Sequence, residues 1–232
     1  MNKLSIKDNR QKMNDGREED LIRTVLKMST TAILSSLGII LSSIVVLVPN
    51  FEFISVTIFL ISLLFGVYYG LISATVIALI YEFIVTPIYG ASGLLIPFKL
   101  LCYFMLAFLT GLFRKKIINL SFWELGIIGS FFALIYDIIT TFGGLLVILI
   151  TNLQTNLPAN ISFASFLSLM IFGAPITITH IIGNFVLFSL TRTLVKWIIS
   201  AFRHRGVKML MIEPFNDFYN DEKQVNITGE TV

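Results

Sequence analysis

Ionisable side chains stand inside or beside the apolar segments of this sequence. Glu82, Lys99, Asp137 and His180 each interrupt a long apolar run, and Glu52 lies in a short segment between two such runs. An ionisable group inside a bilayer costs on the order of a few kcal/mol, and it is usually paired or lines a polar cavity. We expect Glu82 and Lys99 at a similar depth near the outer surface, and Asp137 and His180 deeper, near the midplane. These four residues form either two ion pairs that hold the helices together or the lining of a polar cavity that opens outward.

Polar and small residues accompany the ionisable ones at helical spacing. The stripes are Lys99 and Tyr103, then Asp137, Thr141 and Gly144, and finally Gly173, Thr177, His180 and Asn184. Residues three and four positions apart share one face of a helix. Polar faces on three successive helices favour a shared polar interior over two isolated ion pairs.

A five-residue pattern that ends in a tyrosine and an acidic residue occurs twice in the sequence, and we call this repetition the internal echo. Ala78–Glu82 reads Ala-Leu-Ile-Tyr-Glu, and Ala133–Asp137 reads Ala-Leu-Ile-Tyr-Asp. The echo is either a parallel repeat, as in many transporters, or a coincidence within apolar sequence. In both cases Tyr81 and Tyr136 could stack on a heterocycle while the neighbouring acid accepts its N–H groups.

The amino-acid composition indicates which medium, water or lipid, surrounds the segments that carry these residues. Of 232 residues, 56% are hydrophobic and 13% are charged, and the mean hydropathy is +0.86. Soluble domains have about 25% charged residues, so the bilayer must surround most of this chain. The single cysteine, Cys102, excludes a disulfide framework and is interpreted as a packing residue.

The apolar segments predict an all-α membrane bundle of six transmembrane helices. We expect them near residues 27–48, 54–66, 69–86, 96–113, 122–150 and 167–198. A span needs about 20 apolar residues, and the segment Phe53–Pro87 is too long for one span, so a break is expected at Gly66–Gly70. Helices near 122–150 and 167–198 are long enough to tilt.

The basic residues orient this bundle. Every Lys and Arg except Lys99 lies before residue 28, within Arg114–Lys116, or from Arg192 onward. With six spans these segments share one side, and the positive-inside rule makes it the cytoplasmic side. The predicted organisation is a cytoplasmic tail over 1–24, a transmembrane domain over 25–200 and a second cytoplasmic tail over 201–232, in a multi-pass protein of the cell membrane.

Small residues mark the first predicted helix, which has no ionisable residue between Lys27 and Pro49. Ala32 with Ser36, and Gly38 with Ser42, are each four positions apart. Such pairs let two helices approach closely in lipid. They serve either packing within this bundle or docking to a separate membrane subunit.

Sequence motifs for catalysis and for ATP hydrolysis are missing. The chain has no P-loop, no HExxH, no Cys/His zinc spacing and no GxSxG, so we expect no enzymatic activity, no metal, no cofactor and no nucleic-acid partner. Three hypotheses stay open: a binding and transport subunit, a membrane enzyme that uses Glu82, Asp137 and His180, or a scaffold whose polar residues only join helices.

The layout resembles a known family. A short six-helix chain with both ends inside, a first helix rich in small residues and a split second apolar segment is similar to the substrate-binding S components of energy-coupling-factor transporters. The stretches Val48–Phe53 and Phe65–Gly70 look like the first-loop and second-to-third-helix pattern of that family. The resemblance covers about residues 25–200.

The resemblance implies capture of a vitamin or related micronutrient in an outward-facing pocket, with a transmembrane coupling (T) subunit and two cytoplasmic ATPase subunits as partners in the lipid membrane. Ala32 and Ser36 match the docking pair of the first helix, with Ser where Ala is usual. The segment Tyr89–Gly93 corresponds to the third loop. The predicted substrate-binding residues, from the resemblance and the echo together, are Asn50, Glu52, Tyr81, Glu82, Lys99, Tyr103, Tyr136, Asp137, His180 and Asn184.

Overall fold

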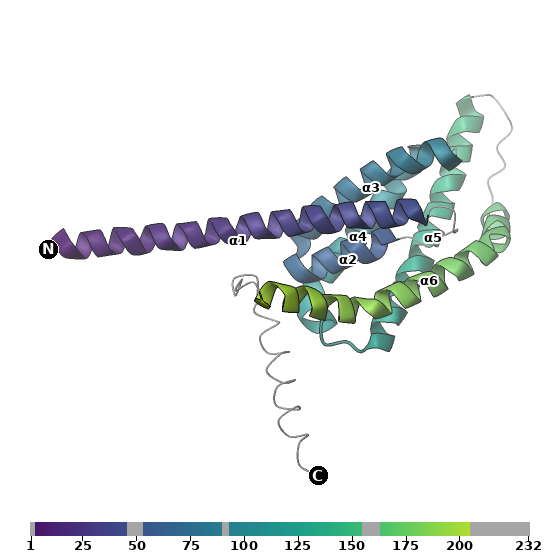
Figure 1. Cartoon of the computed structure of the whole chain (residues 1–232). Coiled ribbons are helices and arrows are strands. Elements are labelled where there is room, and N and C mark those ends of the chain that lie inside the picture. The colour runs from purple at the N-terminus through teal and green to yellow at the C-terminus, as the bar shows by residue number, and fades with distance from the viewer. Residues whose placement is uncertain (1–2, 46–52, 90–92, 155–162, 205–232) are drawn as a thin grey trace, which may run out of the picture.

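The computed structural model describes residues 3–45, 53–89, 93–154 and 163–204, and every element in these ranges is a helix. The elements are α1 (Lys3–Ile44), α2 (Phe53–Phe65), α3 (Val67–Tyr89), the 3₁₀ turn η1 (Gly93–Leu95), α4 (Ile96–Ile117), α5 (Phe122–Gln154) and α6 (Phe163–His204). Figure 1 shows α1 as a long rod whose second half lies along the other helices.

Five of the described helices are long and apolar enough to cross a membrane, as in a multi-pass membrane protein. The apolar spans are Asp20–Ile44, Val67–Ile84, Gly93–Ile117, Phe122–Leu153 and Phe163–Ala201. The remaining helix, α2, has 13 residues. At 1.5 Å per residue it is about 20 Å long, against about 30 Å for the hydrocarbon core. A sixth span therefore stays a prediction.

The short helix α2 is the centre of the bundle. All residues from Ile54 to Phe65 are buried, and α2 contacts α1, α3, α4 and α6. A helix that is apolar on every side either faces lipid or is covered by protein, and the four neighbouring helices cover α2. The split between α2 and α3 falls at Gly66, as expected, with φ of +89°, a backbone conformation that favours glycine.

The first helix begins much earlier than predicted. We expected a polar tail, either without structure or with a surface helix that ends at Lys27, and a first span from about Lys27, whereas α1 is continuous from Lys3 to Ile44. Residues 3–24 contain no proline and are rich in Lys, Arg, Glu, Gln, Leu and Met, which have high helix propensity. The apolar segment supplies the nucleus, and the helix propagates back from it at little cost.

Other boundaries also lie beyond the predicted ones. Pro87, expected in a loop, is within the last turn of α3, where it removes one backbone hydrogen bond. Arg114–Lys116 belongs to the last turn of α4, where positive charge complements the helix dipole. The helices α5 and α6 extend to Gln154 and from Phe163, and α6 contains Pro175. Figure 1 shows α6 curving along its length, as a proline within a helix allows.

Candidate functional site

Asp137 on α5 and His180 on α6 form a hydrogen-bonded pair. The His180 Nδ1 and the Asp137 Oδ1 are 2.9 Å apart, and the side chains are 2% and 13% exposed. The prediction that these residues lie at one depth is confirmed, because they are in direct contact.

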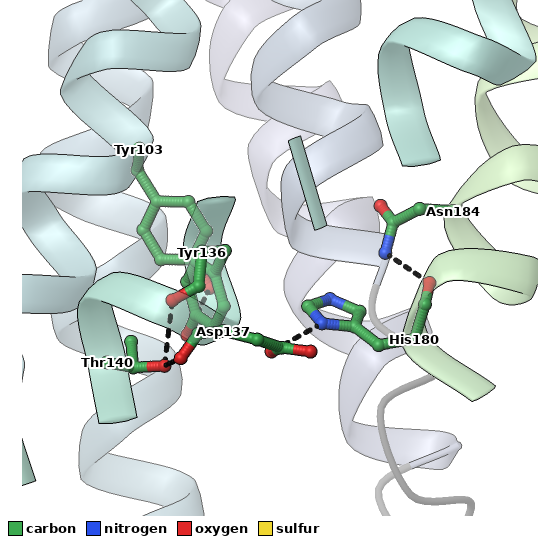
Figure 2. Close-up of polar contacts among 6 residues, drawn as sticks. All are labelled: Tyr103, Tyr136, Asp137, Thr140, His180 and Asn184. Carbon is green, nitrogen blue, oxygen red and sulfur yellow. Dashed lines mark hydrogen bonds and ion pairs between the residues drawn. The ribbon is translucent and has the colours of Figure 1, made fainter. Parts of the chain in front are cut away.

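Two tyrosines surround this pair. The ring of Tyr136 meets the ring of His180 edge to face, with centroids 5.5 Å apart. The hydroxyls of Tyr136 and Tyr103, the latter on α4, are 3.4 Å apart. Figure 2 shows Tyr103 beside Tyr136, and the Asp137 carboxylate reaching toward the imidazole. Three helices thus contribute to one polar and aromatic cluster, as the stripes on them predicted.

Small residues bring α5 and α6 together on one side of the pair. A Cβ built on Gly129 would lie 2.7 Å from the backbone oxygen of Asn184 and 2.5 Å from Cγ of Phe188. The hydroxyl of Ser130 donates to the backbone oxygen of Ile181 at 3.3 Å. We call this contact region the α5–α6 seam. Only a residue without a side chain permits the approach at position 129.

Beyond the pair the two helices separate. A Cβ built on Gly144 of α5 or on Gly173 of α6 would meet no described atom within 4 Å, and Figure 1 shows the ends of α5 and α6 diverging. Asp137 and His180 therefore stand where the seam ends and the space between the helices begins. We call this diverging stretch of the two helices, from Asp137 to Gly144 and from Gly173 to His180, the α5–α6 wedge. The stripe residues Thr141 and Thr177 are half-buried between the pair and the two glycines.

Two buried oxygen atoms near the pair have no hydrogen-bond partner in the described part of the chain: Oδ2 of Asp137 and Oδ1 of Asn184. The Asn184 side chain is fully buried, and its Nδ2 donates to the backbone oxygen of His180 at 3.1 Å. A buried acceptor without a donor costs about 1–3 kcal/mol. Asn184 lies within the seam beside Gly129, so of the two atoms only Oδ2 of Asp137 lies at the end of the seam.

Glu82 on α3 and Lys99 on α4 form the second predicted pair, with Oε1 and Nζ 2.5 Å apart. The side chains are 4% and 17% exposed.

The internal echo has a structural counterpart. Tyr81 and Tyr136 are both buried, and each following acid contacts a basic residue on the next long helix. Lys99 is therefore paired with Glu82. In the contacts described, the basic partner of Asp137 is His180 and not a lysine or arginine.

Asn50, Glu52 and residues 90–92 lie outside the described residues. The other predicted binding residues divide into the cluster of Tyr103, Tyr136, Asp137, His180 and Asn184 and the separate pair of Glu82 and Lys99, with Tyr81 beside Glu82. Within the described ranges, no group of three His, Cys, Asp or Glu side chains could hold a metal ion. The predicted stripes did not include Gly129 and Ser130, although the spacing Gly126, Gly129, Ser130 and Ala133 was a readable signal for a helix contact.

The small residues of α1 separate into two faces. Gly38 and Ser42 are buried, and a Cβ on Gly38 would lie 2.5 Å from Oγ1 of Thr57. Ala32 and Ser36 are exposed. They line a groove of about 390 Å³ between α1 and α3, together with Tyr68, Ile72 and Val76 among others. The first pair packs within the bundle, whereas the second lies on the exposed face of α1.

Comparison with protein-family models, curated proteins and solved structures found no match to this chain.

Proposed function

We propose that this chain is the membrane-embedded substrate-capture subunit of a transporter of the energy-coupling-factor type, and that it imports a vitamin or related micronutrient. It spans the cell membrane six times, with both termini in the cytoplasm. It works with a separate transmembrane coupling subunit and two ATPase subunits, because its own sequence has no P-loop.

The observation that carries this proposal is the position of the Asp137–His180 pair. It lies at the closed end of the α5–α6 wedge, with one unsatisfied carboxylate oxygen and an aromatic ring beside it. Purely structural polar residues would be expected inside the seam, where helix contacts are tight. A polar group at the end of the seam supports ligand recognition, since binding sites of bundles lie between helices.

The exposed pair Ala32 and Ser36 supports a partner subunit. Small side chains on a lipid-facing helix surface allow a second helix to approach closely. The bundle itself uses Gly38 and Ser42 for its internal contact, so the exposed pair has no packing role in the described structure. This division favours docking over internal packing for Ala32 and Ser36.

The test is thermal stabilisation of the detergent-purified chain by a panel of B-vitamins, their precursors and cobalamin. A ligand at a hundred- to thousandfold excess over Kd stabilises the folded state by roughly 3–4 kcal/mol. We expect one strong hit that is lost in Asp137→Asn and retained in Asn119→Ala, an exposed site between α4 and α5. A hit that survives in Asp137→Asn would exclude the proposed site, and a flat panel would favour a scaffold.

A helix-joining role is the second candidate, and it is favoured specifically for Glu82 and Lys99. Their short contact satisfies both charges within the bundle, so neither is required for a ligand. A scaffold function for the whole chain would extend this role to Asp137 and His180, and it predicts no small-molecule ligand for any residue of the cluster.

A further inference from the structure

We propose that a groove formed by α1, α2 and α6 holds one acyl chain of an anionic phospholipid, whose headgroup lies at Lys27 and Arg23 of α1. This lipid site is separate from the proposed capture of a substrate and does not depend on it. The polarity, the side-chain shape, the length and the charge of the groove each support it.

The groove has a floor from α2 and walls from α1 and α6, and we call it the α2 groove. Its volume is about 520 Å³, and Figure 1 shows α1 and α6 on either side of α2. Apart from Thr57, Thr193 and the indole of Trp197, the side chains that line it are apolar, and leucines such as Leu37 and Leu190 form its walls. A polar ligand would lose more hydrogen bonds than it gains here, so the groove suits a hydrocarbon chain.

The side chains of the walls favour a flexible chain over a helix. Leu37, Leu190 and Leu194 are 49%, 45% and 38% exposed, so they project from the walls. Helices approach closely in lipid where small residues face each other, as Ala32 and Ser36 would allow in the groove between α1 and α3. Projecting leucines keep a second helix at a distance, whereas a single acyl chain can lie between them.

The α2 groove has the length of one leaflet of a bilayer. On α6 it runs from Leu187 to Ile198, which is about 16 Å at 1.5 Å per residue. This is about half of the hydrocarbon core, which is roughly 30 Å thick. A groove over one leaflet matches one acyl chain, whereas a partner helix that spans the membrane would need the whole thickness.

One end of the α2 groove leads to two basic side chains of α1. Lys27 and Arg23 precede Leu34 by seven and eleven positions, so they continue its face of the helix. Lys27 is half-buried and Arg23 is exposed, and no ion pair joins either of them to another described residue. Asp20 is the next charged residue on this face, one turn further from the groove. The phosphate of an anionic lipid therefore complements the two charges nearest the groove.

Trp197 stands at the same end on the opposite wall. It lines the groove and is 70% exposed, and tryptophan is typical of the membrane–water interface. Figure 1 shows the C-terminal end of α6 beside α1, on the side where α1 extends to the N-terminus. An interfacial aromatic residue and two basic residues thus meet at one end of an apolar groove, as a lipid with a charged headgroup requires.

The experiment uses tryptophan fluorescence, because the chain has two tryptophans. Trp123→Phe leaves Trp197 as the reporter of the groove. Trp197→Phe leaves Trp123, which is 67% exposed and is not among the residues that line the groove. Each full-length variant is placed in phosphatidylcholine vesicles that contain a minor fraction of phosphatidylglycerol or phosphatidylcholine with brominated acyl chains, which quench tryptophan on contact. We expect brominated phosphatidylglycerol to quench Trp197 more strongly than brominated phosphatidylcholine does, and both lipids to quench Trp123 to a similar extent.

A charge variant and a matched control test the headgroup contact with Trp197 as the reporter. In Arg23→Gln/Lys27→Gln the relative affinity for brominated phosphatidylglycerol should fall roughly fivefold for each basic residue removed. Lys115→Gln/Lys116→Gln also removes two exposed positive charges, in the last turn of α4, and should retain the preference. If the first variant fails to fold, the comparison of the two reporters still decides, because both keep the basic residues.

Three results would overturn the proposal. Equal quenching of Trp197 by the two lipids would reject an anionic headgroup. Weaker quenching of Trp197 than of Trp123 by both lipids would show that a protein surface, such as a second copy of this chain, covers the groove. A preference that survives in Arg23→Gln/Lys27→Gln, or that is lost in the α4 control variant, would place the headgroup away from α1.

Discussion

Asp137 and His180 contact each other at the one level of α5 and α6 where a tight helix contact gives way to open space. On one side Gly129 brings the helices together, and on the other Gly144 and Gly173 meet no described atom within 4 Å. The hydrogen bond at 2.9 Å thus ties the two helices at the end of their seam. It fixes the separation of the helices where the wedge begins, and it leaves Oδ2 of Asp137 without a partner among the described residues.

The single variant His180→Ala should lose more unfolding free energy than the double variant Asp137→Asn/His180→Ala. His180→Ala leaves the Asp137 carboxylate without its donor, and we expect a loss of about 1–3 kcal/mol in unfolding free energy. The double variant Asp137→Asn/His180→Ala has no stranded charge and should recover part of that loss. Thermal unfolding in detergent, followed by far-UV circular dichroism, measures both. Equal stability of the two variants would contradict a charged Asp137.

A methyl group should act in opposite ways at two glycines of α5. Gly129→Ala forces contacts of 2.5–2.7 Å onto Phe188 and Asn184, and we expect a loss of about 1–3 kcal/mol from overpacking. Gly144→Ala enters open space and should be neutral or stabilising by about 0.5–1 kcal/mol, because alanine is the better helix former. Thermal midpoints of the two variants check the pair. Similar destabilisation by both would place the end of the seam elsewhere.

The Glu82–Lys99 pair should behave as a unit. Lys99→Met strands a carboxylate that is 4% exposed, with an expected loss of about 3–5 kcal/mol, whereas Glu82→Leu/Lys99→Met should approach the stability of the unaltered chain. The same thermal measurement applies. Ligand binding should be retained in the double variant if the pair only joins helices, and its loss there would add both residues to the binding site.

Substitutions on the two faces of α1 should affect different properties. Those on the buried face should change thermal stability, and those on the exposed face should change assembly with a partner. Gly38→Val meets the Thr57 side chain and should lower the thermal midpoint without a direct effect on docking. Ala32→Leu/Ser36→Leu alters an exposed face, so it should leave the midpoint unchanged and abolish co-purification with the membrane partner. Pull-downs of tagged chain from native membranes, quantified for transmembrane and ATPase subunits, check this. Retention of both partners in the leucine variant would move the docking site away from this face.

Labelling of single cysteines can establish the number of spans. In a Cys102→Ser background, Gly93→Cys at η1 should react with a membrane-impermeant maleimide on intact cells, and Asn119→Cys, between α4 and α5, only after permeabilisation. Both positions are exposed. The reverse pattern would invert the orientation that the positive-inside rule predicts. Because α2 has 13 residues, Tyr68→Cys, at an exposed position next to the α2–α3 turn, tests whether this turn reaches the cytoplasmic side.

The sequence by itself determined the helical class, the membrane environment and the break at Gly66, because these depend on composition, on run length and on a residue without Cβ. It also predicted that Asp137 and His180 lie at one depth and Glu82 and Lys99 at another, either as ion pairs or as the lining of a cavity, because ionisable groups in an apolar bundle are usually paired or line a polar space.

Tertiary structure decided what local pattern cannot encode. Spacing cannot tell that α1 extends back to Lys3, or that Gly38 faces Thr57 while Ala32 faces outward, because both depend on what packs against the helix. The same holds for the wedge. Gly129 and Gly144 are the same residue on one helix, and only the path of α6 gives one a close contact and the other open space.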